Sequence, residues 1–383
     1  MKILMVSMNS IHFLRWTEQL KDSRHDVYWF DVRDGSPTEK LPWVHKINGW
    51  KLKYPNLKGR HFLKKRLPKL YARLSPIIEN DTARAFEKVV LEIQPDVVHS
   101  FALYVACTPI FKVMQKHKDL KWTYSSWGSD LYYFKNIEKY KRDIVKVLPR
   151  IDYLFTDCKR DVSIAKRLGF KGMVLGTYPG GGGYDYAKHD KYVKTPVGER
   201  NMILVKGYQG RSGRCIEVLK ALVELQRELE PYQVVVFGAD KEVEGFISSE
   251  KVSQKINVMV HGIGAFMPHE SIMKLMGEAL LYIGNSNSDG MPNTLLEAIA
   301  QGAFPIQSNP GGASAEVIKQ NENGLLIEDC EDVEHIKGLV SKALSNPDLM
   351  EKAFKVNQSE IKPRFEIANI RRQVLEAYDN ITT

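Results

Sequence analysis

The sequence predicts an α/β protein with two doubly wound parallel sheets, each in its own domain. Short apolar runs typical of buried strands alternate with amphipathic segments of helical period along both halves of the chain. A glycine-rich stretch at 178–183 interrupts this alternation, which restarts near residue 202. With 383 residues, the chain is long enough for two separate cores.

The expected strands and helices follow one another in the order of a doubly wound fold. The opening run KILMVSM is too short for a helix and is predicted to be a buried strand. In the first half we expect strands at 2–8, 26–31, 95–101, 121–127 and 152–157, with helices at 13–20, 81–93, 107–116, up to 147 and up to 168. In the second half we expect strands at 202–207, 233–238, 256–262, 280–286 and 304–308, with helices up to 229, at 292–301, after 312 and at 361–381.

These elements define the expected domains. We predict a first domain at 1–185, a linker at 186–200, a second domain at 201–360 and a terminal helix at 361–383. Open parallel sheets bind ligands beyond the carboxyl ends of their strands, so we expect both domains to face one cleft.

The composition narrows the class of protein. The four cysteines, Cys107, Cys158, Cys215 and Cys330, lie far apart and are interpreted as reduced thiols. No apolar run approaches the roughly 20 residues of a membrane-spanning helix, and the opening run is too short for a signal peptide. A cytoplasmic protein is therefore predicted.

The net charge of +9 has a local origin. Residues 40–75 contain eleven Lys or Arg and no Asp or Glu, which leaves 44 basic and 46 acidic residues elsewhere. Cations and interleaved aromatic rings suit the inner face of an anionic membrane or a lipid-linked substrate, and a solvated basic surface explains them equally well. Nucleic acid is not expected as a partner. The aromatic residues of this segment are Trp43, Trp50, Tyr54, Phe62 and Tyr71.

The strongest chemical signal lies at 286–316, SNSDGMPNTLLEAIAQGAFPIQSNPGGASAE. Gly290 lets the backbone approach a ligand closely, and Pro292 fits the first turn of a helix. The free N–H groups of that turn, together with the helix dipole, form a site for an anion such as a diphosphate. Glu297 follows Asp289 by eight residues, about two turns into the helix, and can accept two hydrogen bonds from a diol such as a ribose.

With Gly302, Pro305 and Glu316 at these spacings, the segment resembles the retaining glycosyltransferases of the GT-B fold, in particular the large family-4 group. That family has two Glu separated by seven residues, then an Ala–Gly–Pro stretch and a Gly-Gly turn that ends in Glu. Here Asp289 stands where the first Glu is usual. The resemblance covers the second half closely and the first half more loosely.

The resemblance implies a donor site and a path for the end of the chain. Glu297 would hold the donor ribose, and the terminal helix would cross back to the first domain. Contacts to the nucleotide base would come from 261–266. The donor sugar and phosphates would meet the backbone of Gly290, Met291, Pro292 and Asn293.

A departing diphosphate develops negative charge, so fixed cations near it lower the barrier. The family supplies an Arg and a Lys from the loop after the first strand of the second domain, but Tyr208 and Gly213 occupy those positions here. We predict that Lys206 and Arg214 supply these cations, that Asp289 is the third catalytic residue, and that Arg211 contributes to donor binding. Three glycines at the ends of predicted strands complete the donor site: Gly207, Gly238 and Gly262.

In the first domain, the resemblance aligns the sequence WGSD at 127–130 with a family HGSD sequence whose His touches the donor sugar. Trp127 cannot act by charge but can stack on an apolar sugar face, and His12 and His99 are alternatives. Asp130 either caps the following helix or binds acceptor. The remaining first-domain candidates are Asn9, Ser10, Gly128 and Gly181.

No D-x-D sequence or His/Asp cluster with metal spacing is present, so a metal-independent reaction without a cofactor is expected. The expected reaction moves a hexose-type sugar, with retention, from a nucleotide-diphosphate-sugar to a glycan or polyprenyl-linked acceptor. UDP is favoured over GDP, and bacterial cell-surface polysaccharide synthesis is the expected setting. A non-catalytic nucleotide-sugar or glycan-binding protein and a GT-B nucleotide-sugar 2-epimerase are the alternatives.

Overall fold

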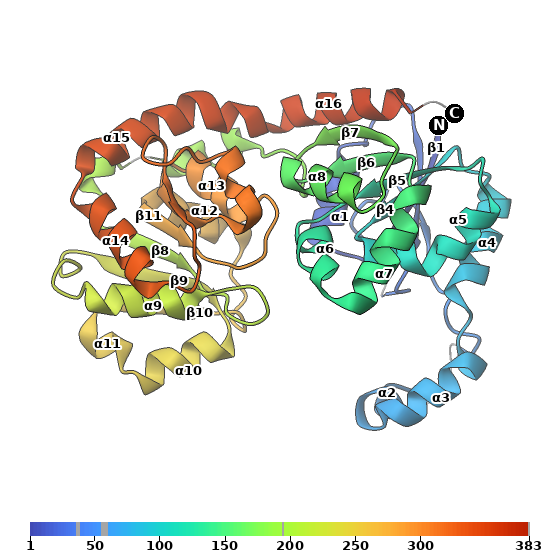
Figure 1. Ribbon diagram of the computed structural model, residues 1–383, viewed down its shortest axis with the longest axis horizontal. Coiled ribbons are helices and arrows are strands. Elements are labelled where there is room, and N and C mark those ends of the chain that lie inside the picture. Colours follow the sequence, from blue (N-terminus) through green and yellow to red (C-terminus); the bar gives the residue numbers. More distant parts are fainter. Residues whose placement is uncertain (36–38, 55–59, 194, 382–383) are drawn as a thin grey trace. The chain divides into compact units, whose positions relative to one another are not determined.

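The computed structural model describes residues 1–35, 39–54, 60–193 and 195–381, without the side chain of His61. The chain forms two compact units. The first unit comprises Met1–Asp157, Asp161–Gly182 and the residues from Arg371 onward, and the second comprises Cys158–Arg160 and Gly183–Ile370. Each unit contains one parallel sheet with helices on both faces (Figure 1), which confirms the predicted α/β architecture.

The sheet of the first unit has the order β3-β2-β1-β4-β5-β6-β7, and all of its strand pairs are parallel. The inner strand β1 is apolar and buried throughout Ile3 to Val6, as expected for a strand covered on both faces. The strands are β1 (Lys2–Ser7), β2 (Asp26–Asp31), β3 (His45–Ile47), β4 (Val97–Phe101), β5 (Lys121–Ser125), β6 (Tyr153–Thr156) and β7 (Met173–Thr177).

Helices cover both faces of this sheet. Leu4 and Val6 pack with α4, α5, α7 and α8 on one face, whereas Met5 lies against Thr17 of α1 on the other. Ser10 and Asp81 cap α1 and α4 with side-chain oxygens. The helices are α1 (Ile11–Glu18), α2 (Arg60–Arg66), α3 (Pro68–Ile78), α4 (Thr82–Ile93), α5 (Phe111–Lys116), α6 (Ser129–Tyr132), α7 (Glu138–Val147) and α8 (Lys159–Arg167).

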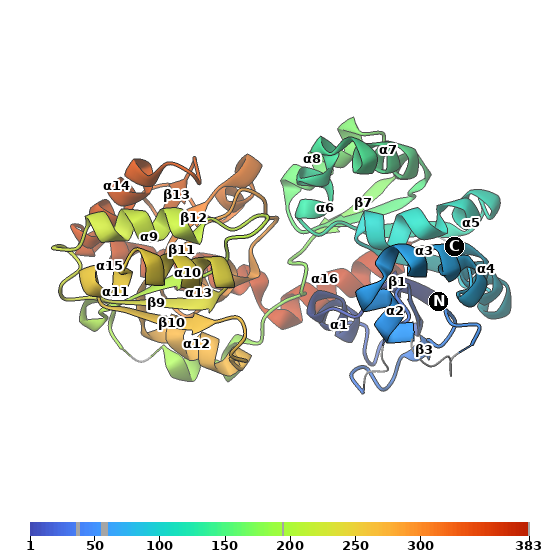
Figure 2. The same cartoon turned by 90° about the horizontal axis from the view of Figure 1, so that it is seen from below.

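The sheet of the second unit has the order β10-β9-β8-β11-β12-β13 and is also fully parallel. Neighbouring residues of one strand face opposite cores: Val205 packs with α9, α10 and α14, whereas Leu204 packs with α12 and α13. Figure 2 shows α10 beside β9 and β10. The strands are β8 (Met202–Lys206), β9 (Gln233–Ala239), β10 (Val258–Gly262), β11 (Ala279–Gly284), β12 (Phe304–Ser308) and β13 (Leu325–Ile327).

The helices of the second unit begin with α9 and end with the last helix of the chain. That helix, α16, belongs to the second unit up to Ile370 and to the first unit from Arg371. Among the described residues, no helix combines the length and apolar character needed to cross a membrane. The helices are α9 (Cys215–Glu224), α10 (Lys241–Ser249), α11 (Val252–Lys255), α12 (His269–Glu278), α13 (Asn293–Ala300), α14 (Val333–Leu344), α15 (Pro347–Val356) and α16 (Ile367–Asp379).

The structure differs from the expected elements in several places. The strands β3, β7 and β13 were not predicted from the sequence. β3 and β13 have three residues each, and β7 contains a glycine and is partly exposed. A helix after Gly312 was also predicted, but a 3₁₀ turn at Ser314–Glu316 is found there. The chain divides after Gly182, and the described residues of the expected linker at 186–200 lie in the second unit.

Candidate functional site

Loops at the carboxyl edge of the second sheet form the core of the candidate site. Gly207 follows β8 and donates its N–H to the Phe237 carbonyl at 2.8 Å. A Cβ at Gly207 would lie 2.6 Å from the Ala239 Cα, and one at Gly262 would lie 2.0 Å from a Glu244 carboxylate oxygen. Gly238 has a φ of +65°, in the left-handed region that favours glycine. Gly207 and Gly238 therefore have local backbone reasons to be glycine, whereas the contact at Gly262 is to the end of a flexible side chain. A contact of the three glycines to the donor stays a prediction.

Lys206 and Asp289 come together at this edge. The Lys206 Nζ lies 3.8 Å from the Asp289 Oδ2 and 5.0 Å from the centre of the Tyr208 ring. Both charged side chains are partly covered, with 18% and 32% exposed. Gly290 donates its N–H to the Asp289 Oδ1 at 3.0 Å, which fixes the turn before α13. Lys206 is thus held between a carboxylate and an aromatic face.

The turn leads directly into α13. Pro292 precedes the helix as its N-cap residue, one position earlier than predicted, and Met291 is buried beneath it. Asn293 is the first helical residue, and its Oδ1 accepts a hydrogen bond from the Tyr184 hydroxyl at 2.6 Å. Glu297 consequently lies about one turn into α13 rather than two.

Glu297 is held by a residue that the sequence did not single out. Its Oε1 lies 2.7 Å from Nε2 of His269, the first residue of α12, and the Glu297 side chain is 5% exposed. The His189 ring lies 5.8 Å from that of His269, and burial together with His269 lowers the pKa of His189. No spacing motif links positions 189, 269 and 297, because only the folded sheet edge brings them together.

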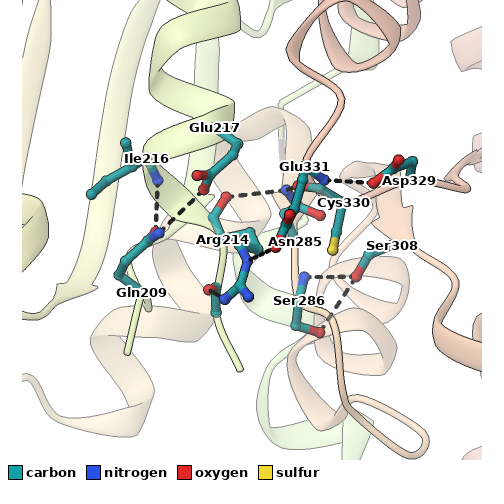
Figure 3. A network of polar contacts seen from close by, with 11 residues as sticks. Gln209, Arg214, Ile216, Glu217, Asn285, Ser286, Ser308, Asp329, Cys330 and Glu331 are labelled. Atoms are coloured by element: carbon teal, nitrogen blue, oxygen red, sulfur yellow. Dashed lines mark hydrogen bonds and ion pairs between the residues drawn. The ribbon is translucent and has the colours of Figure 1, made fainter. Parts of the chain in front are cut away.

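Arg214 has a different partner from Lys206. Its Nε lies 2.9 Å from the Glu331 Oε1, and its Nη1 donates to the Gly213 carbonyl at 2.7 Å (Figure 3). Asn285 donates to the carbonyls of Arg214 and Cys330 at 3.1 and 2.8 Å. The structure therefore directs Arg214 toward Glu331, and the catalytic role predicted for Arg214 stays a prediction. Arg211, in the same loop, is exposed.

A polar network fixes the loop that follows β8. The Gln209 side chain donates to Glu217 at 3.2 Å and accepts from the Ile216 N–H at 2.9 Å (Figure 3). The Asn287 N–H donates to the Ser212 carbonyl at 2.8 Å, which ties the loop to the turn before α13. Both loops of the candidate site are thereby held in one arrangement.

Several first-domain candidates meet at the carboxyl edge of the first sheet. The Trp127 ring lies 5.8 Å from the His12 ring, and a Cβ at Gly180 would lie 3.4 Å from the indole. Trp127 Nε1 is buried and has no hydrogen-bond partner among the described residues. Asn9 is exposed beside Ser10, and Gly181 is buried next to Gly180. The structure thus brings Trp127, His12 and the glycine-rich run together in the first unit.

Two family models match the chain. One, described as glycosyl transferases group 1, matches residues 190–359, and the other, described as glycosyl transferase 4-like, matches residues 2–157. Each model covers most of one unit. The chain belongs to the group 1 glycosyltransferases. No curated protein sequence matches it.

Solved structures of glycosyltransferases share the GT-B fold of this chain. Sucrose-phosphate synthase from Thermosynechococcus elongatus superimposes with a TM-score of 0.73 at 17% identity, over 99% of this chain and 98% of that one. The Anabaena protein HepE in complex with UDP gives 0.70 at 11% identity, and the lipopolysaccharide outer core galactosyltransferase WaaB gives 0.66 at 16%. Both superpositions cover 100% of each chain.

In this glycosyltransferase, His99 does not reach a ligand surface. It is fully buried against α1 and α16, where its Nδ1 lies 2.5 Å from the Tyr378 hydroxyl and its Nε2 lies 2.8 Å from Ser125 Oγ. Burial lowers the pKa of His99 to about 3, so the ring is neutral near pH 7. The prediction that His99 replaces the family histidine is therefore wrong, which leaves Trp127 and His12.

Asp130 also has a structural role. It lies inside α6, and the N-cap residue is Gly128, whose φ is +51°. The Asp130 carboxylate accepts from the Leu103 N–H at 2.9 and 3.0 Å and from the Tyr124 hydroxyl. Burial raises the pKa of Asp130 to about 7. Neither predicted role, capping or acceptor binding, fits a carboxylate enclosed in this way.

One group of side chains has donor atoms close enough to hold a metal ion. Asp157, Cys158 and Asp161 are buried, and their donor atoms lie within 4.8 Å of one another. Asp161 also accepts a hydrogen bond from the Ser126 hydroxyl at 3.0 Å. The sequence spacing did not suggest this group, because ligand motifs at this spacing are uncommon.

Proposed function

We propose that this glycosyltransferase transfers a hexose-type sugar from a nucleotide-diphosphate-sugar, with UDP preferred to GDP. One observation carries the proposal: the nearly buried Glu297 follows the N-terminus of α13, whose entry turn at Asp289 lies beside Lys206. A carboxylate suits a ribose diol, and a helix N-terminus beside a cation suits a diphosphate. The preference for UDP draws support from the solved complex of HepE with UDP.

We further propose that the anomeric configuration is retained and that no metal is required. The acceptor hydroxyl attacks the anomeric carbon from the face on which the nucleotide departs, and the departing phosphate takes up its proton. Lys206 and the backbone N–H groups of Met291 and Asn293 stabilise the negative charge that develops on that phosphate. Asp289 holds Lys206 in place, and no enzyme carboxylate acts as a nucleophile.

The acceptor is proposed to be a glycan or a lipid-linked glycan at the inner face of an anionic membrane, contacted through 40–75, as in bacterial cell-surface polysaccharide synthesis. The basic, aromatic composition of that segment supports a membrane-side acceptor. Similarity of fold to WaaB, a galactosyltransferase of the lipopolysaccharide outer core, points to the same setting.

Release of free nucleotide tests the donor. The protein is incubated with UDP-, GDP- and ADP-sugars, with and without a chelator, and the nucleotide is quantified. Release from a UDP-sugar that persists with chelator supports the proposal, and loss with chelator overturns metal independence. NMR of the product's anomeric centre then tests retention.

A second candidate is a non-catalytic nucleotide-sugar-binding protein. It is favoured by Tyr208, Gly213 and Trp127 at positions where the family resemblance places charged residues. Binding of UDP without turnover across varied acceptors would establish this candidate instead.

A further inference from the structure

A helical hairpin in the first unit is poorly covered by protein. It consists of α2 (Arg60–Arg66) and α3 (Pro68–Ile78), which project beyond the sheet of that unit (Figure 1). Of the eleven residues of α3, one, Tyr71, is buried. Helices in proteins owe most of their stability to packing of an apolar face, so this hairpin presents a face that its own unit leaves uncovered.

The exposed face combines apolar and basic side chains. Phe62 and Ile77 are 64% and 63% exposed, and Leu67 and Leu70 are also exposed. Residues 60–78 contain no Asp or Glu. The cations of the hairpin are Arg60, Lys64, Lys65, Arg66, Lys69 and Arg73.

The base of the hairpin is fixed to the first unit. The Tyr71 hydroxyl donates to the Glu79 Oε1 at 2.5 Å, and the Lys53 Nζ donates to the Pro76 carbonyl at 3.1 Å. The Asn80 N–H donates to the Lys51 carbonyl at 2.7 Å. The exposed side chains are therefore presented by an anchored element.

Charge decides which partner fits this face. The chain outside 40–75 carries 44 basic and 46 acidic residues, so a second copy offers no acidic excess to match the hairpin. Nucleic acid would bind the cations but would leave the aliphatic side chains in water. An anionic bilayer accommodates both, because headgroup phosphates bind the cations and the acyl boundary takes up the apolar side chains.

We propose that the α2–α3 hairpin docks on an anionic lipid bilayer, with Phe62, Leu67, Leu70 and Ile77 inserted at the headgroup level and the basic residues on lipid phosphates. This inference rests on the proposed function and deepens it, because it assigns the membrane contact of 40–75 to one element. Vesicle binding is measured without donor or acceptor. A protein that does not bind vesicles would contradict only the docking proposal, and a protein that binds vesicles but transfers no sugar would contradict only the proposed function.

Vesicle flotation with the full-length protein tests the proposal. Phosphatidylcholine vesicles containing phosphatidylglycerol are compared with phosphatidylcholine alone. We expect binding to the anionic vesicles alone, and weaker binding at high salt. Each basic residue near an anionic surface strengthens binding about fivefold, so Lys64→Glu, Lys65→Glu and Arg66→Glu together should weaken it by at least a hundredfold.

A second variant separates insertion from charge. Replacing Phe62, Leu67 and Leu70 by Ser keeps every cation, and we expect at least a tenfold loss of binding that low salt does not restore. The matched control reverses three exposed cations of α7, Lys139, Lys141 and Arg142, and should retain binding. Unchanged binding in both hairpin variants, or an equal loss in the α7 control, would overturn the proposal.

Discussion

His269 holds the carboxylate that we assign to the donor ribose, so its removal should weaken nucleotide binding by a defined amount. The Nε2–Oε1 distance is 2.7 Å, and Glu297 is 5% exposed whereas His269 is 39% exposed. A hydrogen bond to a charged group contributes about 1.5–3 kcal/mol. Water can reach the half-exposed side of the pair in a His269→Ala variant, so we expect a loss near 1 kcal/mol, about fivefold in the Kd of UDP.

Calorimetric titration with UDP measures this effect. Glu297→Ala removes both acceptor oxygens and should weaken UDP binding by about a hundredfold, whereas Glu278→Gln, at the far end of α12, should leave it unchanged. In the proposed assignment Glu297 binds the nucleoside part of the donor, so kcat should fall by a smaller factor than KM rises in His269→Ala. Equal Kd values for His269→Ala and Glu278→Gln would refute the reasoning.

Three further predictions concern other parts of the molecule. Lys206→Ala removes the cation beside Asp289 and should lower kcat by about 100- to 1,000-fold in nucleotide-release assays, with a smaller change in KM. The control Lys220→Ala, on the surface of α9, should keep the wild-type kcat and KM. Trp127→Ala should lower kcat/KM about tenfold and Trp127→Phe should retain most of it if the indole stacks on a sugar; equal effects would contradict stacking. The pKa of His99 is lowered to about 3 in the folded state, so the unfolded chain binds a proton at this residue between about pH 6.5 and 3 and the folded chain does not. The free energy of unfolding should therefore be highest above about pH 6.5 and should fall by about 1.4 kcal/mol per pH unit as the pH drops toward 3. Urea unfolding followed by tryptophan fluorescence should show this acid loss in wild type and a flatter profile in His99→Gln.

Strand patterns and the glycine-rich break were enough to predict two parallel sheets, because strands buried on both faces are continuously apolar. The same reasoning predicted the turn between β11 and α13 that carries Asp289, Gly290 and Glu297, since these residues stand in one stretch of chain. Partners from distant elements could not be predicted in this way, because His269 meets Glu297, and His189 meets His269, only in the folded second unit.

The two errors of assignment share one physical cause. His99 lies in the middle of β4 and Asp130 lies in α6 after β5, and α16 and the Leu103 backbone enclose them. Their burial depends on segments 279 and 27 residues away in the chain, which no local pattern reveals.

The shared helix α16 has a consequence for biosynthesis. Tyr378 accepts a hydrogen bond from the Trp16 indole at 3.2 Å and contacts His99, and the Arg371 guanidinium donates to the Gln19 carbonyl at 3.1 Å. These interactions complete the core of the first unit with residues that are synthesised after the whole second unit. The first unit can therefore finish folding only after the second unit has been synthesised, and a chain truncated before Arg371 would leave a hydrophobic face of the first unit uncovered.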